Sequence, residues 1–285
     1  MAQDNKKILI LGNGFIGQRC VSEWPRAILS DKRISTADDV LALIDEYRPD
    51  SILNAAGVTG KPNVDWCEDH QFETFFGNTI LPIEIAKACQ KRGVYMLHLG
   101  TGCIFYGDST HDDGKWREHD YANPVAVYTR SKYAADLVLS TLPNVGIARL
   151  RMPTDHIPHS ANLIDKIVKY PKVVDVVNSI TIMDDLIMAL GRLLEQRGEG
   201  IFHTVNPGFI RHRDIIALYQ ELVDPRHTCE WLTEEELVET GLAKKKRSNN
   251  VMDSTRLEAL GIRMRPVREA IRDCMEKYAK AVEVK

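Results

Sequence analysis

The chain has 285 residues, 44% of them hydrophobic, so it can bury one large core or a nucleotide domain with a smaller lobe. Its formal net charge of -3 comes from interspersed acids and bases, which indicates neither a nucleic-acid-binding face nor a charged tail. The polar segment Met1–Lys6 precedes no apolar run long enough for a membrane span, so we expect a cytoplasmic protein without membrane or nucleic-acid partners. The six cysteines form no close C-x-x-C pair, which predicts reduced thiols and no metal site.

Short β-branched runs alternate with helical patterns through the first half of the chain. The expected elements are strand Lys7–Leu11, helix Gly14–Ser22, strand Arg26–Leu29, helix Ala37–Tyr47, strand Ser51–Asn54, helix Leu81–Lys91, strand Tyr95–Leu99, helix Val127–Leu142 and strand Val145–Arg149. Repeated strand–helix–strand units imply a parallel sheet covered on both faces. We therefore predict an α/β fold, a Rossmann-type doubly wound parallel sheet with ligands at the carboxyl ends of its strands.

After Pro153 the segments become shorter and more mixed. We expect helix Leu163–Tyr170, strand Val173–Val177, helix Met183–Glu195, strand Ile201–Thr204, helix Arg211–Leu222 and a terminal helix Val267–Ala279. The predicted division is an NAD(P)-binding domain over residues 1–155 and a smaller mixed α/β substrate lobe over residues 156–285, some segments of which return to the first domain.

A glycine-rich loop follows the first expected strand and opens a helix, with the residues Gly12, Asn13, Gly14, Phe15, Ile16 and Gly17. The pattern G-x-G-x-x-G in this place favours a dinucleotide site over a structural turn, because glycines let the backbone approach a pyrophosphate at the helix N-terminus. After the second strand, Asp31 suits the ribose hydroxyls of NAD(H), whereas Lys32 and Arg33 suit a 2′-phosphate. We favour NADP(H), the alternative being a solvated charge cluster.

Tyr128 and Lys132 lie four residues apart on an expected helix and therefore on one face of it. A phenol with an ordinary pKa of about 10 donates a proton at neutral pH only where a nearby cation favours the phenolate. A Y-x-x-x-K pair alone is common on helix surfaces, so a catalytic role for it depends on other site residues elsewhere in the sequence.

The strand ending near Leu99 brings Thr101 to the carboxyl edge of the expected sheet. In an extended chain Cys103 would project to the same side as Thr101, although an inert packed thiol explains Cys103 equally well. Asn78 is expected in a helix that packs behind this site. Small residues that would allow close cofactor approach end the third strand, namely Asn54, Ala55, Ala56 and Gly57.

Together these motifs resemble the extended short-chain dehydrogenase/reductase family, and within it the dTDP-4-dehydrorhamnose reductase group. The nearest likeness is to plant-type bifunctional nucleotide-rhamnose synthases with epimerase and reductase activity. The resemblance spans nearly the whole chain and is carried by N-A-A-G-V-T-G-K-P-N-V-D-W-C-E (Asn54–Glu68), T-G-C-I-F from Thr101, the Tyr128/Lys132 pair, R-M-P from Arg151, V-V-D-V-V-N-S-I-T-I-M-D-D from Val173 and R-S-N-N from Arg247. Leu11 departs from the usual G-x-x-G-x-x-G frame, and Pro153–Ser160 differs from the plant sequences.

The resemblance implies an NAD(P)H-dependent reductase of a nucleotide-activated 4-keto sugar, with Thr101, Tyr128 and Lys132 as catalytic residues. It assigns Cys103 and Lys166 to epimerisation at C3 and C5, where protons beside a ketone are acidic because an enolate forms; plain helix surface is the alternative for Lys166. It also implies a homodimer through the helices bearing Asn78 and Tyr128. Implied substrate contacts are Val58, Thr59 and Asn63. Arg247 followed by Asn250 fits a pyrophosphate clamp in the second lobe, because a guanidinium binds phosphate with two hydrogen bonds; the alternative is a solvated basic loop, which we favour for the three lysines before Arg247.

Two other kinds of function remain open on this fold. A nucleotide-sugar 4-epimerase or 4,6-dehydratase would recycle its cofactor, so net consumption of NAD(P)H separates it from a reductase. A non-catalytic regulatory subunit would have no need of Thr101, Tyr128 and Lys132, all of which are intact. The sequence leaves open whether the substrate carries dTDP or UDP.

Overall fold

The computed structural model describes residues 6–283, so the polar segment Met1–Lys6, from which we expect a cytoplasmic protein, lies almost wholly outside the described residues. The chain divides into two compact units that are each discontinuous in sequence. The first unit contains the residues up to Ile104, Ala126–Arg149 and Ile187–Phe202, and the second contains Phe105–Val125, Leu150–Leu186 and the residues from His203 on. The predicted boundary after residue 155 falls inside a segment of the second unit.

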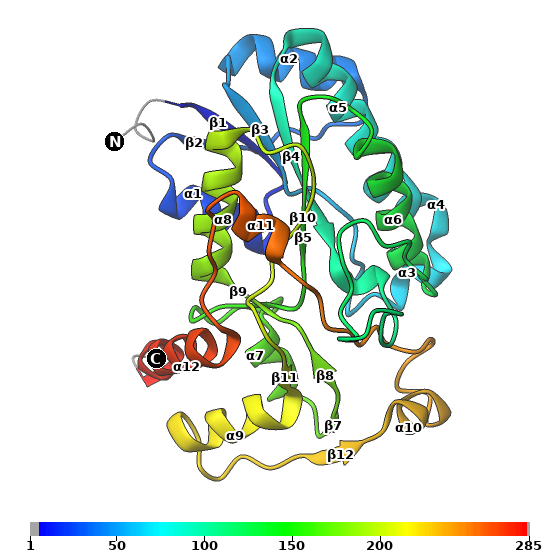
Figure 1. The fold of residues 1–285 in the computed structure, drawn as a ribbon, viewed down its shortest axis with the longest axis vertical. Coiled ribbons are helices and arrows are strands. Elements are labelled where there is room, and N and C mark those ends of the chain that lie inside the picture. Colours follow the sequence, from blue (N-terminus) through cyan, green and yellow to red (C-terminus); the bar gives the residue numbers. More distant parts are fainter. Residues whose placement is uncertain (1–5, 284–285) are drawn as a thin grey trace. The chain divides into compact units, whose positions relative to one another are not determined.

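The first unit is built on a six-stranded sheet with the strand order β10-β5-β4-β3-β1-β2 (Figure 1). β1 pairs in parallel with β2 and β3, and β3 pairs in parallel with β4, which confirms the predicted Rossmann-type sheet. From β1 the chain adds β2 on one side and β3 on the other, so the strand order reverses between β1 and β3. In sheets of this kind, ligands bind beyond the carboxyl ends of the strands where the order reverses. The strands are β1 Ile8–Leu11, β2 Ala27–Ser30, β3 Ser51–Asn54, β4 Tyr95–Thr101, β5 Val145–Leu150 and β10 Gly200–His203.

The helices of this unit are α1 Phe15–Glu23, α2 Ala37–Tyr47, α3 Trp66–Asp69, α4 Gln71–Phe75, α5 Leu81–Arg92, α6 Val127–Leu139 and the part of α8 (Met183–Gln196) that follows Leu186. A π-helical turn, Phe76–Ile80, joins α4 to α5. We did not predict α3, α4 or this turn, because segments of four or five residues are too short to display a helical period.

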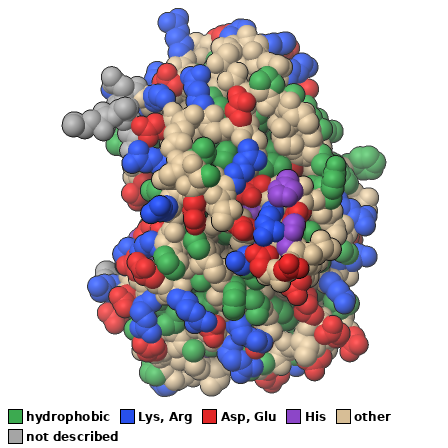
Figure 2. Space-filling view, in the orientation of Figure 1, with side chains coloured by type: hydrophobic (Ala, Val, Ile, Leu, Met, Phe, Trp, Pro, Cys, Tyr) green, Lys and Arg blue, Asp and Glu red, His purple; other side chains and the backbone are tan. Residues whose placement is uncertain are grey.

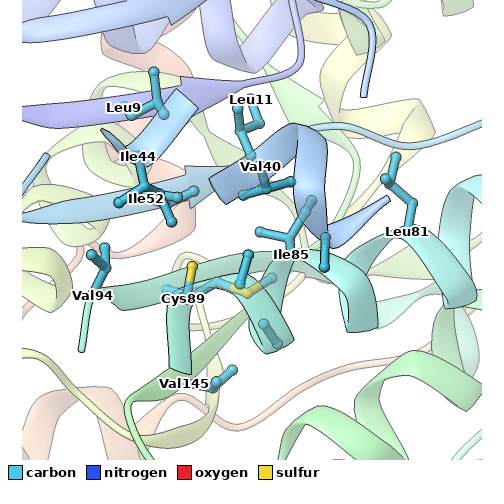
Figure 3. Packing of buried hydrophobic residues seen from close by; sticks show 14 of the residues in the cluster. Leu9, Leu11, Val40, Ile44, Ile52, Leu81, Ile85, Cys89, Val94 and Val145 are labelled. Carbon is cyan, nitrogen blue, oxygen red and sulfur yellow. The ribbon is translucent and has the colours of Figure 1, made fainter. Parts of the chain in front are cut away.

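One face of the sheet is covered by α2, α5 and α6, whose apolar residues form one buried cluster with those of the strands. Figure 3 shows Val40 and Ile44 of α2 and Ile85 and Cys89 of α5 gathered against the sheet. All four side chains are nearly or fully buried. Burial of this face fixes α6, which carries the Y-x-x-x-K pair, relative to the ends of the strands.

The second unit contains three two-stranded sheets, which pair β11 with β8, β12 with β7 and β6 with β9. The strand predicted over Val173–Val177 is wrong as one element, since β7 ends at Val174 and β8 begins at Val177, and the two pair with different strands. The strands are β6 Pro153–Thr154, β7 Lys172–Val174, β8 Val177–Asn178, β9 Thr181–Ile182, β11 Ile210–Arg211 and β12 Glu230–Leu232. The helices are α7 Leu163–Ile167, α9 His212–Leu222, α10 Glu234–Glu239, α11 Thr255–Ala259 and α12 Val267–Glu283.

Two general expectations concern the surface and the thiols. Figure 2 shows acidic and basic side chains interspersed over the visible face. Among residues 6–283, none of the helices combines the length and the apolar composition that a membrane span requires. The six cysteines all lie in the described part of the chain and are free thiols, as predicted.

Candidate active site

The glycine-rich loop turns between β1 and α1. Gly12 has a φ of 111°, a conformation that glycine adopts without strain. A β-carbon on Gly12 would overlap the backbone of Ala55 and Ala56, which follow β3, whereas one on Gly14 would have no atom within 4 Å. Gly14 precedes α1, and it provides no side-chain cap for that helix. The N–H groups of its first turn therefore suit an anion such as a pyrophosphate.

Three charged residues follow β2, and all of them are exposed. Lys32 forms an ion pair with Glu46 of α2. Within residues 6–283, no ion pair engages Arg33, although several neighbouring charges are paired. Of the two candidate cations, Arg33 is therefore the one whose charge is not already matched by a carboxylate.

Thr101, Tyr128 and Lys132 converge within the first unit. Thr101 is the last residue of β4, and its side chain lowers the pKa of the Tyr128 phenol on α6. One turn further along α6, the buried Lys132 donates from Nζ to the carbonyl oxygen of Leu99 at 2.6 Å. The three residues predicted to act together thus lie at the carboxyl end of one central strand and on the helix beside it.

Burial determines the proton affinities of this group. It raises the pKa of Tyr128, while the side chain of Thr101 acts in the opposite direction. Burial also lowers the pKa of Lys132 to about 8, while the negative charge of Asp136 acts in the opposite direction. Both side chains thus favour their neutral forms more strongly than they would in water.

Cys103 lies in a 3₁₀ turn, Gly102–Ile104, rather than in an extended segment. The argument that an extended chain projects Thr101 and Cys103 to the same side is therefore wrong, because β4 ends at Thr101. The turn instead lets the Cys103 backbone N–H donate to Thr101 Oγ1 at 3.2 Å. That bond orients the threonine hydroxyl, and the turn packs against α6, which carries Tyr128.

The position of α6 depends on residues from the Asn54–Glu68 segment and the π-helical turn. Asn78 donates to Ser131 Oγ on α6 at 3.1 Å and exchanges two hydrogen bonds of 2.8 Å with the backbone of Val58. The carboxylate of Glu68 accepts from the backbone N–H of Val127, the first residue of α6, at 2.8 Å. Glu68 thus serves as a helix cap supplied from elsewhere in the chain, a role that its place in the motif did not reveal.

His98 is a second residue that sequence reasoning missed. It is fully buried in β4, with Nδ1 2.9 Å from Asn54 Nδ2 and Nε2 3.2 Å from Lys132 Nζ. A polar residue in the apolar run Y-M-L-H-L was the available signal, since buried polar groups in strands require partners. Asn54, predicted to admit the cofactor, thus also belongs to a hydrogen-bonded chain that ends at Lys132.

The remaining predicted residues are divided between the units. Val58, Thr59 and Asn63 lie in the loop after β3 in the first unit, where Asn63 Oδ1 accepts from the backbone of Asp65 at 2.8 Å. Lys166 belongs to the second unit, on α7, and it is exposed there, whereas an acid of the expected kind would be partly desolvated.

Arg247 and Asn250 also belong to the second unit. Arg247 is half-buried, and Asn250 is buried, donating from Nδ2 to the Phe105 carbonyl oxygen at 2.8 Å and to Ser248 Oγ at 2.9 Å. The contacts of Asn250 hold the R-S-N-N segment in place. The structure therefore gives this asparagine an architectural role in addition to any contact with a ligand.

A pocket of about 260 Å³ lies within the second unit. Arg211 in its wall is paired with Asp175 at 3.0 Å, and Asp175 also pairs with Arg213, whose guanidinium lies 4.4 Å from the ring centroid of Trp231. Because Arg211 is matched by a carboxylate, the pocket suits a ligand group rich in hydrogen-bonding atoms more than a bare anion. Its polar lining consists of Asp108, Asp175, Arg211, Glu234, Asn249 and Asn250.

Comparison with known proteins identifies relatives over nearly the whole chain. A bifunctional dTDP-4-dehydrorhamnose 3,5-epimerase/reductase of Arabidopsis thaliana is 33% identical over 277 residues, which are 95% of this chain and 91% of that protein. A trifunctional UDP-glucose 4,6-dehydratase/epimerase/reductase of the same plant is 32% identical over 283 residues, but the chain spans only 41% of its length.

Solved structures show the same fold. The crystal structure of a UDP-rhamnose synthase of Acanthamoeba polyphaga mimivirus matches with a TM-score of 0.88 and 27% identity, covering 95% of this chain and 99% of that one. A dTDP-4-dehydrorhamnose reductase of Bacillus anthracis in complex with NADP matches with a TM-score of 0.80 at 20% identity, covering 94% of this chain and 98% of that one. At that identity the second likeness concerns the fold alone.

The resemblance inferred from the motifs is confirmed by these relatives and by a family profile, described as the RmlD substrate-binding domain, which matches residues 22–280. The matched region contains most of the first unit and most of the second. The chain therefore belongs to the family of the RmlD substrate-binding domain.

Proposed function

We propose that this protein is an NAD(P)H-dependent reductase of a nucleotide-activated 4-keto-6-deoxy hexose. The observation that carries the proposal is the convergence of Thr101, Tyr128 and Lys132 at the carboxyl end of β4, in the same unit as the Gly12 loop. The named relatives are reductases and synthases of rhamnose nucleotides, which supports the substrate class.

The residues present fit a nicotinamide cofactor, because Gly12 and Gly14 leave the start of α1 accessible to a pyrophosphate. When bound, the cofactor would supply the hydride for C4 of the sugar. Tyr128 would give its phenolic proton to the C4 oxygen, while the hydroxyl of Thr101 polarises that carbonyl. Lys132 would hold the ribose and favour the phenolate that remains, which then regains a proton from solvent.

The single test is net oxidation of NADPH or NADH with UDP- or dTDP-4-keto-6-deoxyglucose as substrate. A reductase consumes one reduced cofactor per sugar, whereas a 4-epimerase or a 4,6-dehydratase returns it. Absence of net oxidation with these sugars and with a pre-epimerised 4-keto-rhamnose nucleotide would exclude the proposal.

Epimerisation at C3 and C5 is a second candidate activity, favoured by the packing of the 3₁₀ turn that holds Cys103 against α6, which carries Tyr128. A thiol beside the phenol can exchange protons next to the C4 ketone, with Lys166 proposed as its partner. Performed in D2O, the same assay measures deuterium at C3 and C5 by NMR. Cys103→Ser should lower exchange by orders of magnitude and spare reduction of the pre-epimerised substrate, because a hydroxyl is a much weaker acid than a thiol. A serine variant that exchanges as fast as the wild type would remove Cys103 from this role.

The preference for NADP(H) over NAD(H) is proposed on the charges after β2. Arg33 is exposed and forms no ion pair with the described residues, while Lys32 is paired with Glu46. Arg33→Ala should therefore raise KM for NADPH by about 10-fold or more and leave KM for NADH nearly unchanged. Lys32→Ala provides the matched control, and an equal effect of both variants would contradict the assignment.

We propose that the nucleotide end of the substrate binds in the second unit. The pocket lined by Asn249 and Asn250 offers hydrogen-bonding atoms for a base or a ribose, and the half-buried Arg247 offers a guanidinium for the pyrophosphate. Arg247→Lys should weaken binding of free UDP or dTDP, measured by calorimetry, while cofactor binding persists. Unchanged affinity would exclude Arg247 from the clamp.

We also propose a homodimer formed through the helices beside the active site. Phe72, Phe76 and Ile80 follow one another at intervals of four residues and are 91%, 40% and 48% exposed. Leu137 and Val138 of α6 are exposed as well, and α6 packs against α4 and the π-helical turn. Such an apolar patch is typical of an interface between subunits.

The oligomeric state tests this surface directly by light scattering at micromolar concentration. Phe72→Glu should convert a dimer to a monomer, whereas Tyr121→Glu, at a residue of the second unit that is 86% exposed, should leave it intact. A monomeric wild type would refute the proposal.

A further inference from the structure

Three buried polar side chains of the second unit hold the segment that lines its pocket. Arg151 and Asn178 are fully buried, and Ser248 is 8% exposed. Arg151 donates from Nε to Asn178 Oδ1 at 3.1 Å and from Nη1 to Ser248 Oγ at 3.0 Å. Its Nη2 group donates to Asn178 Oδ1 and to the Ser248 carbonyl oxygen. The guanidinium thus ties Asn178 to the R-S-N-N segment, which continues into the pocket wall at Asn249 and Asn250.

The donors around Asn178 fix the orientation of its amide. A guanidinium has only donors, and the backbone N–H of Asn250 also donates to Asn178 Oδ1, at 3.1 Å. Reversing the amide would set its NH₂ group against all of these N–H groups. The side-chain oxygen of Asn178 must therefore face Arg151, and its NH₂ group must face the other way.

This orientation determines that of Asn249, a residue of the pocket wall. Asn178 Nδ2 donates to Asn249 Oδ1 at 3.1 Å, and the backbone N–H of Gly107 donates to the Asn249 carbonyl oxygen at 2.9 Å. Because the side-chain oxygen of Asn249 accepts this bond, its NH₂ group lies on the opposite side of the amide. One hydrogen of that group faces the Arg247 carbonyl oxygen at a nitrogen–oxygen distance of 3.5 Å, which is long for a hydrogen bond. The Asn249 side chain thus offers a hydrogen-bond donor to a ligand.

A carboxyl group lines the same pocket. Glu234, the first residue of α10, is half-buried, and burial raises its pKa while the side chain of Asn249 acts in the opposite direction. When ionised, this group offers only acceptors. The wall therefore combines a donor from Asn249 with an acceptor from Glu234. Its apolar members can contact the faces of a flat ring, and they are Val176, Val177 and Val251.

This combination is complementary to one edge of a pyrimidine base. Uracil and thymine present a carbonyl oxygen beside a ring N–H, so one donor and one acceptor pair with them. Cytosine presents an amino group beside a bare ring nitrogen, which is the reverse order. A donor set against that amino group leaves polar groups of the site without partners, and such a mismatch lowers affinity strongly.

We infer that Asn249 and Glu234 recognise the uracil or thymine base of the substrate, and that Arg151 and Asn178 hold Asn249 in the required orientation. This assignment rests on the proposed function, because it concerns the nucleotide end of the same substrate. Asn249 and Glu234 contact the base. Arg151 and Asn178 act through Asn249 and are therefore positioning residues.

Calorimetry of free nucleotides with the full chain tests the assignment without turnover. UDP and CDP differ only at the base edge that the wall contacts, so the ratio of their dissociation constants isolates recognition of the base. We expect the wild type to bind UDP at least about 10-fold more tightly than CDP. Equal affinities, or binding of neither nucleotide, would overturn the inference.

The positioning role is tested by Asn178→Asp, which keeps the oxygen that Arg151 binds but replaces the donating NH₂ group by an acceptor. Asn249 must then turn its own NH₂ group toward the new carboxylate and its oxygen toward the pocket. The preference for UDP over CDP should fall by about 10-fold or more. A merely structural defect would weaken both nucleotides alike and leave the ratio unchanged, which would overturn the positioning role.

The matched control is Ser179→Ala. Ser179 is fully buried, and its Oγ accepts from the backbone N–H of Met252 at 2.9 Å, so this variant loosens the same stretch of chain without altering either amide. It should keep the wild-type ratio of UDP to CDP affinity. An equal fall of the ratio in Ser179→Ala and Asn178→Asp would contradict the inference.

Asn249→Asp changes the wall itself at a half-buried position, so it provides a test even if Asn178→Asp does not fold. Its side chain presents only acceptors, and the preference for UDP should disappear or reverse, while its charge repels both diphosphates alike. A variant with this change in ratio that oxidises no NAD(P)H even as wild type would retain the base site and lose the proposed function. Reduction by the wild type, together with an unchanged ratio in Asn249→Asp, would retain the function and overturn the inference.

Discussion

The buried ion pair between Asp136 and Arg149 offers the sharpest test of the energetics beside the site. Arg149 Nε lies 2.8 Å from Asp136 Oδ2, and the two side chains are 2% and 0% exposed. At an effective dielectric constant of about 20, opposite charges about 4 Å apart attract by about 4 kcal/mol. Removing one partner leaves the other charge buried and unmatched. We therefore expect Arg149→Met to lower the free energy of unfolding by about 3–5 kcal/mol near neutral pH.

The loss should depend on pH in a defined direction. Burial already raises the pKa of Asp136 above 3.8 although Arg149 opposes it, and removing Arg149 should raise it further. A carboxyl whose pKa is raised by folding contributes stability at pH below its unfolded value, and that contribution is lost as the pH rises through its folded value. The deficit of Arg149→Met should therefore be larger at about pH 7.5 than at about pH 5.

Urea unfolding of four proteins measures both effects as a double-mutant cycle. Asp136→Leu should be as harmful as Arg149→Met, because it leaves a guanidinium buried without a counter-charge. The double variant Asp136→Leu/Arg149→Met should recover most of the loss, since apolar pairs often replace buried ion pairs without penalty. A single variant that loses less than about 1 kcal/mol, or a deficit that does not change with pH, would refute this reasoning.

Three further variants test individual contacts. Tyr128→Phe should lower reductase turnover by roughly 10²–10⁴-fold while cofactor binding persists, as steady-state kinetics and cofactor titration would show, and near wild-type turnover would exclude Tyr128 as the acid. Glu68→Ala removes the cap of α6 at Val127, so it should lower the free energy of unfolding by about 1–2 kcal/mol and reduce kcat more than cofactor affinity. Glu68→Gln keeps the accepting oxygen and should lower the free energy of unfolding by less than about 1 kcal/mol. Gly12→Ala should destabilise the cofactor-free protein by about 1–3 kcal/mol in thermal unfolding, because the new β-carbon would overlap the backbone of Ala55 and Ala56. Gly14→Ala should change the stability by no more than about 0.5 kcal/mol, and equal losses in the two variants would contradict the geometry.

The chemical framework of the first unit could be predicted from sequence because local patterns carry it. Alternating strand and helix periods indicated a parallel sheet, and parallel strands place their carboxyl ends at one edge. Gly12, Ala55 and Thr101 each follow or end such a strand, so their shared edge followed from chain order. The helical spacing of Tyr128 and Lys132 put both on one face in the same way.

Local patterns failed where a conformation depends on contacts rather than on period. The extended geometry assumed for Cys103 was wrong because β4 ends at Thr101, where Cys103 N–H finds the threonine hydroxyl. One strand was expected over Val173–Val177, yet two short strands form because each has a different partner strand.

The sequence by itself determined the sheet, the phosphate loop and the catalytic face of α6, because these depend on residues near one another in the chain. Only the tertiary structure decided which residues contact Lys132 and the start of α6 and so position the catalytic face. Asn54 meets His98, His98 meets Lys132, and Glu68 meets the start of α6 across separations of 44, 34 and 59 residues. The hydrophobic periodicity of the sequence does not predict such contacts, because a hydrogen bond between distant segments depends on how the strands and helices pack. Burial then gives these contacts their strength, because a polar group removed from water must find its partner within the protein.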